Sequence, residues 1–541
     1  MSRQFSLKNA SFGLMLSFML FMVAACATEP TEGDETEGDA SDGQASEGEE
    51  GGEGGDLLIS MLSEAVSLDV HGSNDTYSSN MTSQIYETLV QHDADLELQP
   101  DLAEDWDQIE DTVWEFELRE GVTFHDGAEF NAEAVKANFD RILDTDIASQ
   151  RAFLYEMVTE VEVVDDYTVR FHTEYPFAPL PAHLAHDGGS IMSPESIEAD
   201  YAAMEEGEEP GSYINANASG TGYFAFDEWV QGDYIRLTKN EDYWGEPAKV
   251  DTVTVRVVPE GGTRMAELQS GNAHIIDPIS PNDLAEIEAT DGITVDTQES
   301  VMIMYVGFNA EQEYLDNSNV RKAISLAIDR GEVLEAAYDG VGIEAKSPLA
   351  PAVFGYDESI ESNEHNLDEA RQLLAEEGLE DGFDITFHTS DEQERQYIAE
   401  YVQSALEEIN INVSIDVQEW GSFLDFTAEG NQEMFVLSWS TVTGDGDYGL
   451  YPLFHSSNQG APGNRTFTDS EELDEWLEIG RESSDEAERL EAYREVQNYI
   501  AKEAIIQPLV HQDYMVGLSE DVQGFWQHPT RKLMLQDVTI N

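Results

Sequence analysis

The sequence predicts an α/β protein of roughly two or three domains. Apolar and polar residues alternate in several segments, as at Val113, Phe116 and Leu118, and this alternation indicates half-buried strands. Other segments carry apolar residues at helical spacing, and the two patterns interleave along the chain. A length of 541 residues exceeds one ordinary core, and 40% hydrophobic residues allow more than one core to be buried.

The expected elements follow in order from residue 57. In the first half we expect strands at 57–62, 111–119, 161–173, 250–258 and 274–277, and helices at 81–90, from Ala132 onward and at 264–271. In the second half we expect strands at 301–309, 411–417, 434–437 and 504–510, and helices at 319–329, 367–379, 397–409 and 486–501.

The chain is strongly acidic, with 113 acidic and 25 basic residues and a formal net charge of −88. A phosphate backbone would be repelled, which excludes nucleic acid as a partner. Residues 1–55 hold 11 of the acids and 2 of the bases, so the part from Asp56 onward carries a net charge of −79, and only 8 of the 25 bases are lysine. Such self-repulsion indicates a habitat of high salt or high pH, halophilic or alkaliphilic.

Residues 1–55 predict the location of the protein in the cell rather than a folded domain. Arg3 and Lys8 precede an apolar segment at 12–25, which is too short for a comfortable membrane span and typical of a secretory signal. The segment ends at Cys26 and resembles a bacterial lipoprotein signal, in which that cysteine is lipidated; a chance cysteine is the alternative. Residues 26–55, rich in Gly, Glu, Asp, Ser and Thr, predict a flexible acidic tether.

An unusual segment, SWSTVTGDGDYGLYPLFHS, follows the apolar run at 434–437. It sets Asp445 and Asp447 among glycines, with Trp439 and Tyr448 close by. Glycine permits close approach of the backbone to a ligand, carboxylates hold an ammonium group, and aromatic side chains bury apolar parts. The segment predicts a pocket for a small zwitterion such as a peptide. An acidic turn in an acidic protein is the alternative.

Three segments carry a resemblance to a known family. Residues 97–142, from LELQPDLAEDW to FELREGVTFHDGAEFNAEAVKANFDRI, place a strand, an FHDG turn and a helix in family order. Residues 220–245 and the segment NVRKAISLAID at 319–329 continue the match, although Tyr223 stands where proline is usual. The chain resembles the extracellular solute-binding proteins of family 5, the dipeptide- and oligopeptide-binding proteins of ABC importers, over most of residues 57–540.

This resemblance implies a bilobed periplasmic-binding-protein-like fold of type II, in the large peptide-binder class, with a hinge between the lobes. We expect a signal peptide at 1–25, a tether at 26–55, a first lobe at 56–307 with an inserted subdomain at about 97–220, a second lobe at 308–507, and a segment at 508–541 that returns to the first lobe. The strand at 301–309 is expected to cross between the lobes.

The resemblance also implies roles for particular residues. Asp447 fits best the family aspartate that holds a ligand's α-amino group, and Asp445 is the fallback. Arg465 is the nearest candidate for a ligand carboxylate, Arg264 being weaker, while Trp439 and Tyr448 are expected to exclude water. The sequence TVTGDGDYGLYPLFHSS departs from the commoner DYxDP form and looks more like the glutathione or dipeptide subgroup.

The implied function is that of a lipid-anchored receptor and not of an enzyme. It would capture an extracellular peptide (dipeptide, oligopeptide or glutathione-like) as a monomer without a cofactor. It would then deliver the peptide to an ABC permease with separate ATPase subunits. The expected location is the outer face of the cytoplasmic membrane, or the periplasmic side in a cell with an outer membrane.

Other functions were weighed against this one. Family members that bind nickel, haem or oligosaccharide remain alternatives, and a surface hydrolase using His125, Asp126 or the acid pair is the rival from another class. His183 and His186 could ligate a metal, but no HExxH pattern accompanies them. Asp445 and Asp447 suggest calcium only faintly, because the terminal Glu of an EF-hand is absent. The sequence has neither a Walker loop nor GxSxG.

Overall fold

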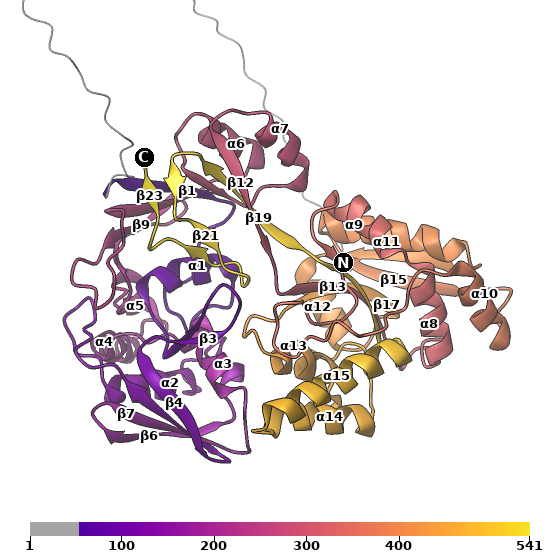
Figure 1. The fold of residues 1–541 in the computed structure, drawn as a ribbon, viewed down its shortest axis with the longest axis horizontal. Helices are drawn as coiled ribbons and strands as arrows, with labels where there is room; N and C mark the ends of the chain where they lie inside the picture. The colour runs from indigo at the N-terminus through magenta and orange to yellow at the C-terminus, as the bar shows by residue number, and fades with distance from the viewer. Residues whose placement is uncertain (1–53, 462) are drawn as a thin grey trace, which may run out of the picture. The chain divides into compact units, whose positions relative to one another are not determined.

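The computed structural model describes residues 54–461 and 463–541. The predicted signal peptide, Cys26 and nearly all of the predicted tether lie outside the described residues. The described part contains three large β-sheets with helices between their strands (Figure 1). This interleaving confirms the predicted α/β class.

The first lobe is built on a seven-stranded mixed sheet. Its central strand, β1, pairs in parallel with β10 on one side and β11 on the other. Because β1 is covered on both faces, its sequence is nearly continuously apolar, with Leu57 and Ile59 fully buried. In sheet order the strands are β12 Ile293–Glu299, β19 Asp513–Ser519, β11 Ile275–Asp277, β1 Asp56–Met61, β10 Thr252–Val257, β9 Tyr234–Lys239 and β8 Phe224–Val230.

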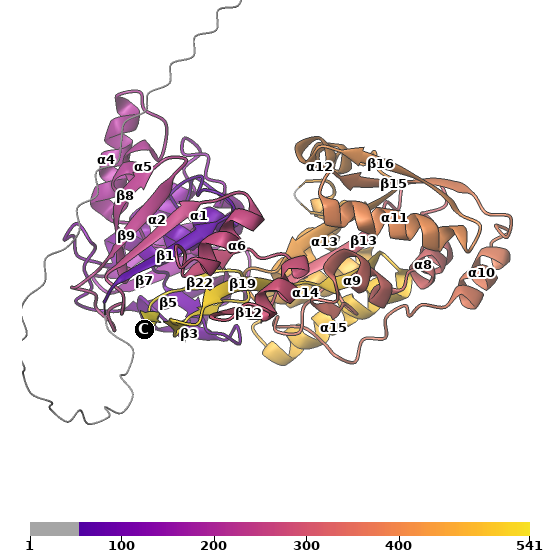
Figure 2. The same cartoon turned by 90° about the horizontal axis from the view of Figure 1, so that it is seen from above.

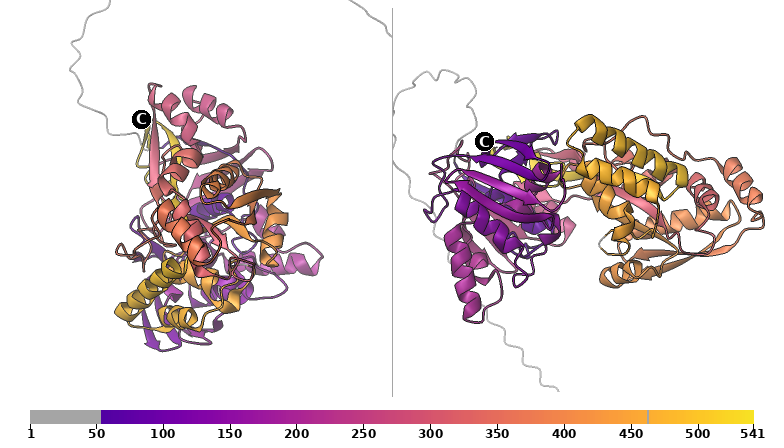
Figure 3. Two further views of the ribbon diagram at one scale, coloured as in Figure 1. Left: turned by 90° about the vertical axis from the view of Figure 1, so that its right-hand side faces the viewer. Right: turned by 90° about the horizontal axis from the view of Figure 1, so that it is seen from below.

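A four-stranded antiparallel sheet forms a second part of the first lobe, within the range expected for the inserted subdomain (Figure 3, right, indigo to purple). Its order is β4 Ala103–Glu110, β5 Val113–Leu118, β7 Thr168–Thr173 and β6 Val158–Asp165. The single strand predicted at 161–173 is wrong, because the chain turns at Asp166 and Tyr167 and the two halves pair as a hairpin. Its own core includes Phe116, Phe139 and Phe171.

The second lobe is built on a six-stranded sheet. Its strands, in sheet order, are β14 Ile343–Glu344, β18 Ile506–His511, β13 Met302–Phe308, β17 Met434–Ser440, β15 Asp384–Ser390 and β16 Asn412–Gln418. Figure 2 shows α8, α10 and α11 beside β15 and β16, and these elements share one buried core. Leu477, Tyr493 and Val496, from the helix pair α14–α15, belong to a separate core with β17.

The chain passes between the two large sheets twice. It leaves β12 at Glu299 and enters β13 at Met302, and it returns from β18 at His511 to β19 at Asp513. The crossings therefore fall at Ser300–Val301 and at Gln512, rather than at the predicted positions 307/308 and 507/508. The apolar strands β13 and β18 lie wholly in the second sheet because both their edges pair there. In Figure 1, β19 runs from the first sheet toward β13.

The helices of the first lobe are α1 Thr76–Ile85, α2 Ala132–Ile142, α3 Leu180–Leu184, α4 Pro194–Glu205, α5 Ser212–Ala216, α6 Gly261–Gln269 and α7 Leu284–Glu288. Those of the second lobe are α8 Ser318–Ala327, α9 Arg330–Tyr338, α10 Leu367–Glu376, α11 Gln393–Glu407, α12 Trp420–Ala428, α13 Gly446–Phe454, α14 Glu471–Glu482 and α15 Glu486–Glu503. Within residues 54–461 and 463–541, no helix is both long and apolar enough for a membrane span.

The first helix begins and ends earlier than predicted. Asp75 caps α1 by accepting a hydrogen bond from the Ser78 backbone N–H, which starts the helix at Thr76 instead of Met81. The residues that follow leave the helix, and Val90 begins the short strand β2 Val90–His92, which pairs with β3 Leu98–Pro100. The apolar residues expected on a helical face at 86–90 are therefore buried by an extended chain.

Candidate functional site

The segment predicted to form a binding loop is divided between a strand and a helix. β17 extends through Ser440, and α13 begins at Gly446 after a turn. Asp445 caps this helix, its carboxylate accepting a hydrogen bond from the Asp447 backbone N–H at 2.9 Å. The turn requires glycine at 444, where φ is +68° and a Cβ would lie 3.1 Å from the Nε2 atom of His92.

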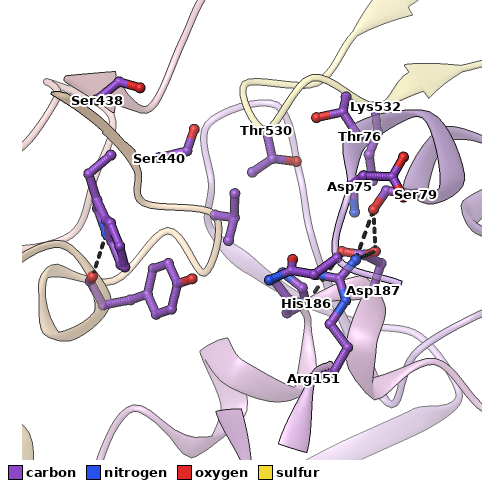
Figure 4. A pocket seen from close by; sticks show the side chains of 14 residues that line it. Asp75, Thr76, Ser79, Arg151, His186, Asp187, Ser438, Ser440, Thr530 and Lys532 are labelled. Carbon is purple, nitrogen blue, oxygen red and sulfur yellow. Dashed lines mark hydrogen bonds and ion pairs between the residues drawn. The ribbon is translucent and has the colours of Figure 1, made fainter. Parts of the chain in front are cut away.

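A cavity of about 240 Å³ lies at the end of β17, between the two lobes (Figure 4). Ser438 and Ser440 lie on one side, and Asp75, Ser79 and Asp187 lie on the other. The predicted residues Trp439 and Tyr448 both line the cavity. The remaining lining residues, which come from the first lobe, the turn after β17 and the C-terminal segment, are Asn74, Thr76, Arg151, His186, Val442, Thr530 and Lys532.

Trp439 and Tyr448 form one aromatic wall. The Trp439 Nε1–H donates a hydrogen bond to the Tyr448 carbonyl at 2.9 Å, and the two ring centroids are 5.3 Å apart. Tyr448 also stacks on Phe153 of the first lobe at 6.4 Å and packs against that lobe's core. Burial raises the pKa of Tyr448 to about 12, so its hydroxyl stays protonated at neutral pH.

The first-lobe wall carries a polar network around Asp187. Its Oδ2 accepts hydrogen bonds from Ser79 Oγ at 2.6 Å and from the Arg151 guanidinium at 3.0 Å. Burial alone would raise the pKa of Asp187, but Arg151 and the other neighbours, Lys532 and the Ser79 hydroxyl among them, together outweigh it and hold this pKa below its usual range. Burial, together with Arg151, lowers the pKa of His186 to about 3, so the imidazole is neutral. The wall thus offers both signs of charge at fixed positions.

Lys532 brings a second cation to this cavity from the C-terminal segment. Within the described part of the chain, its ammonium group makes no hydrogen bond or ion pair, although Asp187 and Asp101 are close enough to attract it. Burial lowers the pKa of Lys532 and the two carboxylates oppose that shift. A ligand carboxylate is the kind of group that would satisfy this amine.

Asp447 lies outside the described cavities and is 1% exposed. Its two carboxylate oxygens accept hydrogen bonds from Arg481 at 2.8 and 2.9 Å. A direct contact with a ligand ammonium group therefore requires this ion pair to open. The expected role of Asp447 stays a prediction, and the structure adds a competing role as an internal ion-pair partner.

Asp445 is also paired with an arginine, but unlike Asp447 it lines a cavity. Its carboxylate accepts hydrogen bonds from Arg489 at 2.8 Å and from the Tyr493 hydroxyl at 3.2 Å. It also lines a second cavity between the lobes, of about 590 Å³. The two acids therefore have different surroundings: Asp445 lines a cavity, while both oxygens of Asp447 are bonded to Arg481.

Arg465 lines a third cavity, of about 460 Å³, which shares Ser438 and Trp439 with the first. Its Nε–H donates to the Thr427 hydroxyl at 2.9 Å, and burial lowers the pKa of Arg465. The weaker candidate, Arg264, lies in the first lobe and donates to the backbone carbonyls of Val258, Pro259 and Pro278. Arg264 thus holds backbone carbonyls of its own lobe, whereas Arg465 lines the same cavity as Trp439. A role for Arg465 toward a ligand carboxylate stays a prediction.

The histidines weighed for catalysis or metal binding have contacts of their own. His125 Nε2 lies 2.9 Å from the Gly222 carbonyl, which ties the FHDG turn to the segment at 220–222. His183 Nδ1 lies 2.9 Å from the Leu154 carbonyl, and His186 Nδ1 accepts from the Gly188 N–H at 2.9 Å. In the described residues, these ring nitrogens hold loops in place.

Sequence reasoning missed Asp75, Arg151, Asp187 and Lys532. Only Asp75 had a local signal, since an acid followed by Thr-Tyr-Ser is typical of a helix start. The other three come from segments far apart in sequence. Their meeting depends on the packing of the four-stranded sheet and the C-terminal segment beside α1.

The chain is similar to known proteins over most of its length. Residues 97–461 match the family of bacterial extracellular solute-binding proteins, family 5. The chain is 31% identical over 495 residues to the glutathione-binding protein GsiB of Salmonella typhi. The matched region covers 90% of this chain and 94% of that protein. The chain therefore belongs to family 5 of the bacterial extracellular solute-binding proteins.

Solved structures agree with this assignment. DppA of Helicobacter pylori, an ABC transporter-associated periplasmic binding protein in complex with the peptide STSA, is 30% identical, with a TM-score of 0.76 over 90% of this chain and 98% of that one. HbpA2 of Haemophilus parasuis is 28% identical, with a TM-score of 0.81 over 90% of this chain and 100% of that one. These matches confirm the predicted bilobed type II fold of periplasmic peptide-binding proteins.

Proposed function

We propose that this chain captures a short extracellular peptide between its lobes and delivers it to the permease of an ABC importer. The observation that carries the proposal is the cavity at the end of β17, where an aromatic wall faces fixed charges of both signs. A zwitterionic peptide matches this arrangement, because its carboxylate can approach Lys532 and its ammonium group can approach Asp75 or Asp187.

The edge of β17 supports the same ligand. On one side β17 pairs with β13 along its whole length, up to Ser440. On the other side, the described residues pair with it only at Met434 and Phe435, through β15. Ser438 to Ser440 therefore offer backbone groups at the cavity. A peptide in extended conformation can add to such an edge as a strand, which gives affinity with little dependence on side chains.

The third cavity extends this ligand site. It adjoins the first at Ser438 and Trp439, and its wall contains Arg465. We place one acidic group of the ligand there, as expected from the sequence. The GsiB relatives are named for glutathione, and a glutathione-like tripeptide or a dipeptide is the ligand class that fits two neighbouring cavities of about 240 and 460 Å³.

Anchoring through a lipid on Cys26 completes the proposal. The binding lobes would then stay near the permease on the outer face of the cytoplasmic membrane, held by the acidic tether. Separate ATPase subunits would drive transport, and the receptor would act as a monomer that releases its ligand unchanged. The rival hydrolase reading predicts a cleaved ligand instead.

Mass spectrometry of ligand carried through purification tests both the class and the ligand. An intact peptide of two to about four residues supports the proposal. Nickel, haem or an oligosaccharide in its place would overturn the peptide assignment. Incubation with the identified peptide should return it uncleaved, whereas cleavage would favour the hydrolase.

Trp439→Ala should weaken binding of that peptide about tenfold, because a stacked aromatic wall contributes on the order of 1 kcal/mol beyond the area it buries. Trp229→Ala is the matched control, since Trp229 lies on the edge strand β8 and lines none of the described cavities. Calorimetry gives both affinities. Equal losses for the two variants would place the ligand elsewhere.

A further inference from the structure

The second cavity between the lobes has no role in the proposal above. At about 590 Å³ it is larger than the cavity at Trp439. First-lobe residues near β2, β3 and β5 form one wall, and residues near Phe354, the turn at 443–445 and the start of α15 form the other. Val442 lines the first cavity and Thr443 lines the second, so both cavities border the same turn.

The charges of this second cavity are almost all negative. Asp95, Glu97 and Glu486 line it, and in the described part of the chain none of the three has an ion-pair partner. The lining cation is Arg489, which is already bonded to Asp445 at 2.8 Å. The cavity therefore keeps about three uncompensated negative charges, which favour a positively charged occupant.

His92 gives an independent sign of a missing partner. Its side chain lines the cavity, the residue is 8% exposed, and its imidazole makes no hydrogen bond to any residue that the structure describes. Burial, with Lys532 nearby, lowers the pKa of His92 to about 3, so the ring is neutral and one nitrogen has a free lone pair. The ring nitrogens keep some accessibility at the cavity, so a ligand N–H can reach this acceptor.

The rest of the lining is apolar. Leu96, Leu98, Val353 and Phe354 contribute to it, together with Trp114, whose Nε1–H is bonded to the Phe177 carbonyl. An occupant with an aliphatic stem and a charged head matches apolar walls below a rim of carboxylates. An anionic or purely apolar occupant would leave the acids unpaired.

We propose that this cavity receives the basic side chain, lysine or arginine, of the peptide bound at Trp439. The assignment rests on the proposed function, because the peptide backbone is what brings the side chain to the turn at 442–444. It makes the receptor selective for peptides that carry a positive charge, in addition to the backbone charges that all peptides share.

The test uses tripeptides that differ in one group. Lysine is placed at each of the three positions in turn and compared with norleucine, which keeps a similar aliphatic stem and lacks the ammonium group. Titrations are run on the full chain in about 1 M NaCl, where the Debye length is about 3 Å and the general attraction of an acidic protein for cations is screened.

At one position we expect lysine to bind at least about threefold more tightly than norleucine, a modest preference because the acids at the rim are solvent-exposed. The double variant Glu97→Gln, Glu486→Gln should remove this preference and leave the norleucine peptide unaffected. Glu117→Gln with Glu400→Gln is the control, because both residues are exposed acids that line none of the described cavities.

His92→Leu adds a variant that changes no charge on the protein at neutral pH. It should lower the affinity for the lysine peptide more than for the norleucine peptide, since it removes the imidazole acceptor and leaves an apolar side chain. A preference for lysine that survives in the Glu97/Glu486 variant overturns the assignment, as does equal binding of lysine and norleucine at all positions. Failure of every peptide to bind rejects the proposed function itself.

Discussion

Asp447 and Arg481 form a two-point ion pair between α13 and α14, with Nε–Oδ1 and NH2–Oδ2 distances of 2.8 and 2.9 Å. The pair also touches the first lobe. His183 Nε2 lies 3.8 Å from Asp447 Oδ2, and the Ala178 backbone N–H donates to the Arg481 carbonyl at 3.0 Å. The guanidinium lies 3.2 Å from the centre of the Tyr451 ring. The Asp447 carboxylate thus ties the first turn of α13 to α14 and lies at the contact between the lobes.

We expect Asp447→Asn to lower the free energy of unfolding of the ligand-free protein by about 2 to 5 kcal/mol, because it leaves a largely buried guanidinium without its counter-charge. Urea unfolding at constant salt measures this loss. Asp140→Asn is the control: it breaks an exposed pair with Lys136 and should cost at most about 1 kcal/mol. Similar small losses in both variants would show that the Asp447 pair adds little stability.

The same variant tests the ligand role predicted from the sequence. Calorimetry is run with a peptide and its amino-acetylated form, on the wild type and on Asp447→Asn, which completes a double-mutant cycle. Because both oxygens of Asp447 are bonded to Arg481, we expect the two losses to add. Strong coupling between them would instead show that Asp447 meets the ligand ammonium group after the pair opens, and the cycle on Asp445 is then the control.

The ionisation of Glu87 should by itself lower stability as pH rises through the range in which this carboxyl titrates. Burial raises the pKa of Glu87 from about 4.5 to about 7, although Trp244 and Tyr243 donate hydrogen bonds to it. A carboxyl whose pKa is raised by folding contributes stability below its unfolded pKa, and this contribution is lost as pH rises through the folded value. Buried histidines such as His92 and His186, whose pKa values are lowered, act in the opposite direction over this range. The Glu87 contribution is therefore measured as the difference between wild type and Glu87→Gln in urea unfolding at intervals between about pH 5 and pH 8.

Glu87→Gln should gain stability relative to the wild type as pH rises over that range, because glutamine keeps an acceptor and does not ionise. Glu400→Gln, an exposed change, should follow the wild-type curve. Identical slopes in wild type and Glu87→Gln would mean that Glu87 does not ionise in this range, and Asp101, whose pKa burial also raises, is the next to test.

Salt should raise the melting temperature. The part from Asp56 onward carries a net charge of −79, and the Debye length falls from tens of Å in dilute buffer to about 3 Å near 1 M. Screening weakens self-repulsion of the folded state, so the midpoint should increase over that range in sodium chloride. Sucrose at matched osmolality separates screening from solvent exclusion. A flat melting temperature in salt would contradict the inferred habitat.

Cys26→Ser should release the protein from membranes without changing its fold or its ligand affinity, because the predicted lipid is separated from the lobes by the tether. Fractionation in detergent-free buffer measures the release, and Ser46→Ala in the same predicted tether is the control. Sedimentation of Cys26→Ser with membranes would contradict the lipoprotein assignment.

Much of the fold could be predicted because most elements carry a local pattern. β13, α8, α11 and α15 lie where apolar periodicity placed them, within a few residues. The errors arose where a short turn or a helix cap, rather than apolar periodicity, set the bounds of an element. The hairpin β6–β7 was taken as one strand because its turn, Asp166–Tyr167, interrupts the alternation only briefly. The helix at 76–85 was placed too late because its first residues are polar and its start is set by the Asp75 cap.

The sequence by itself determined the class of the fold, the family and the extreme acidity. Only the tertiary structure showed that both acids of the segment around Trp439 and Tyr448 are already paired with arginines. Asp447 and Asp445 are two residues apart, yet Arg481 and Arg489 approach them from 34 and 44 residues along the chain. A carboxylate's availability depends on whether a cation already neutralises it, and contacts over such separations leave no local pattern in the sequence.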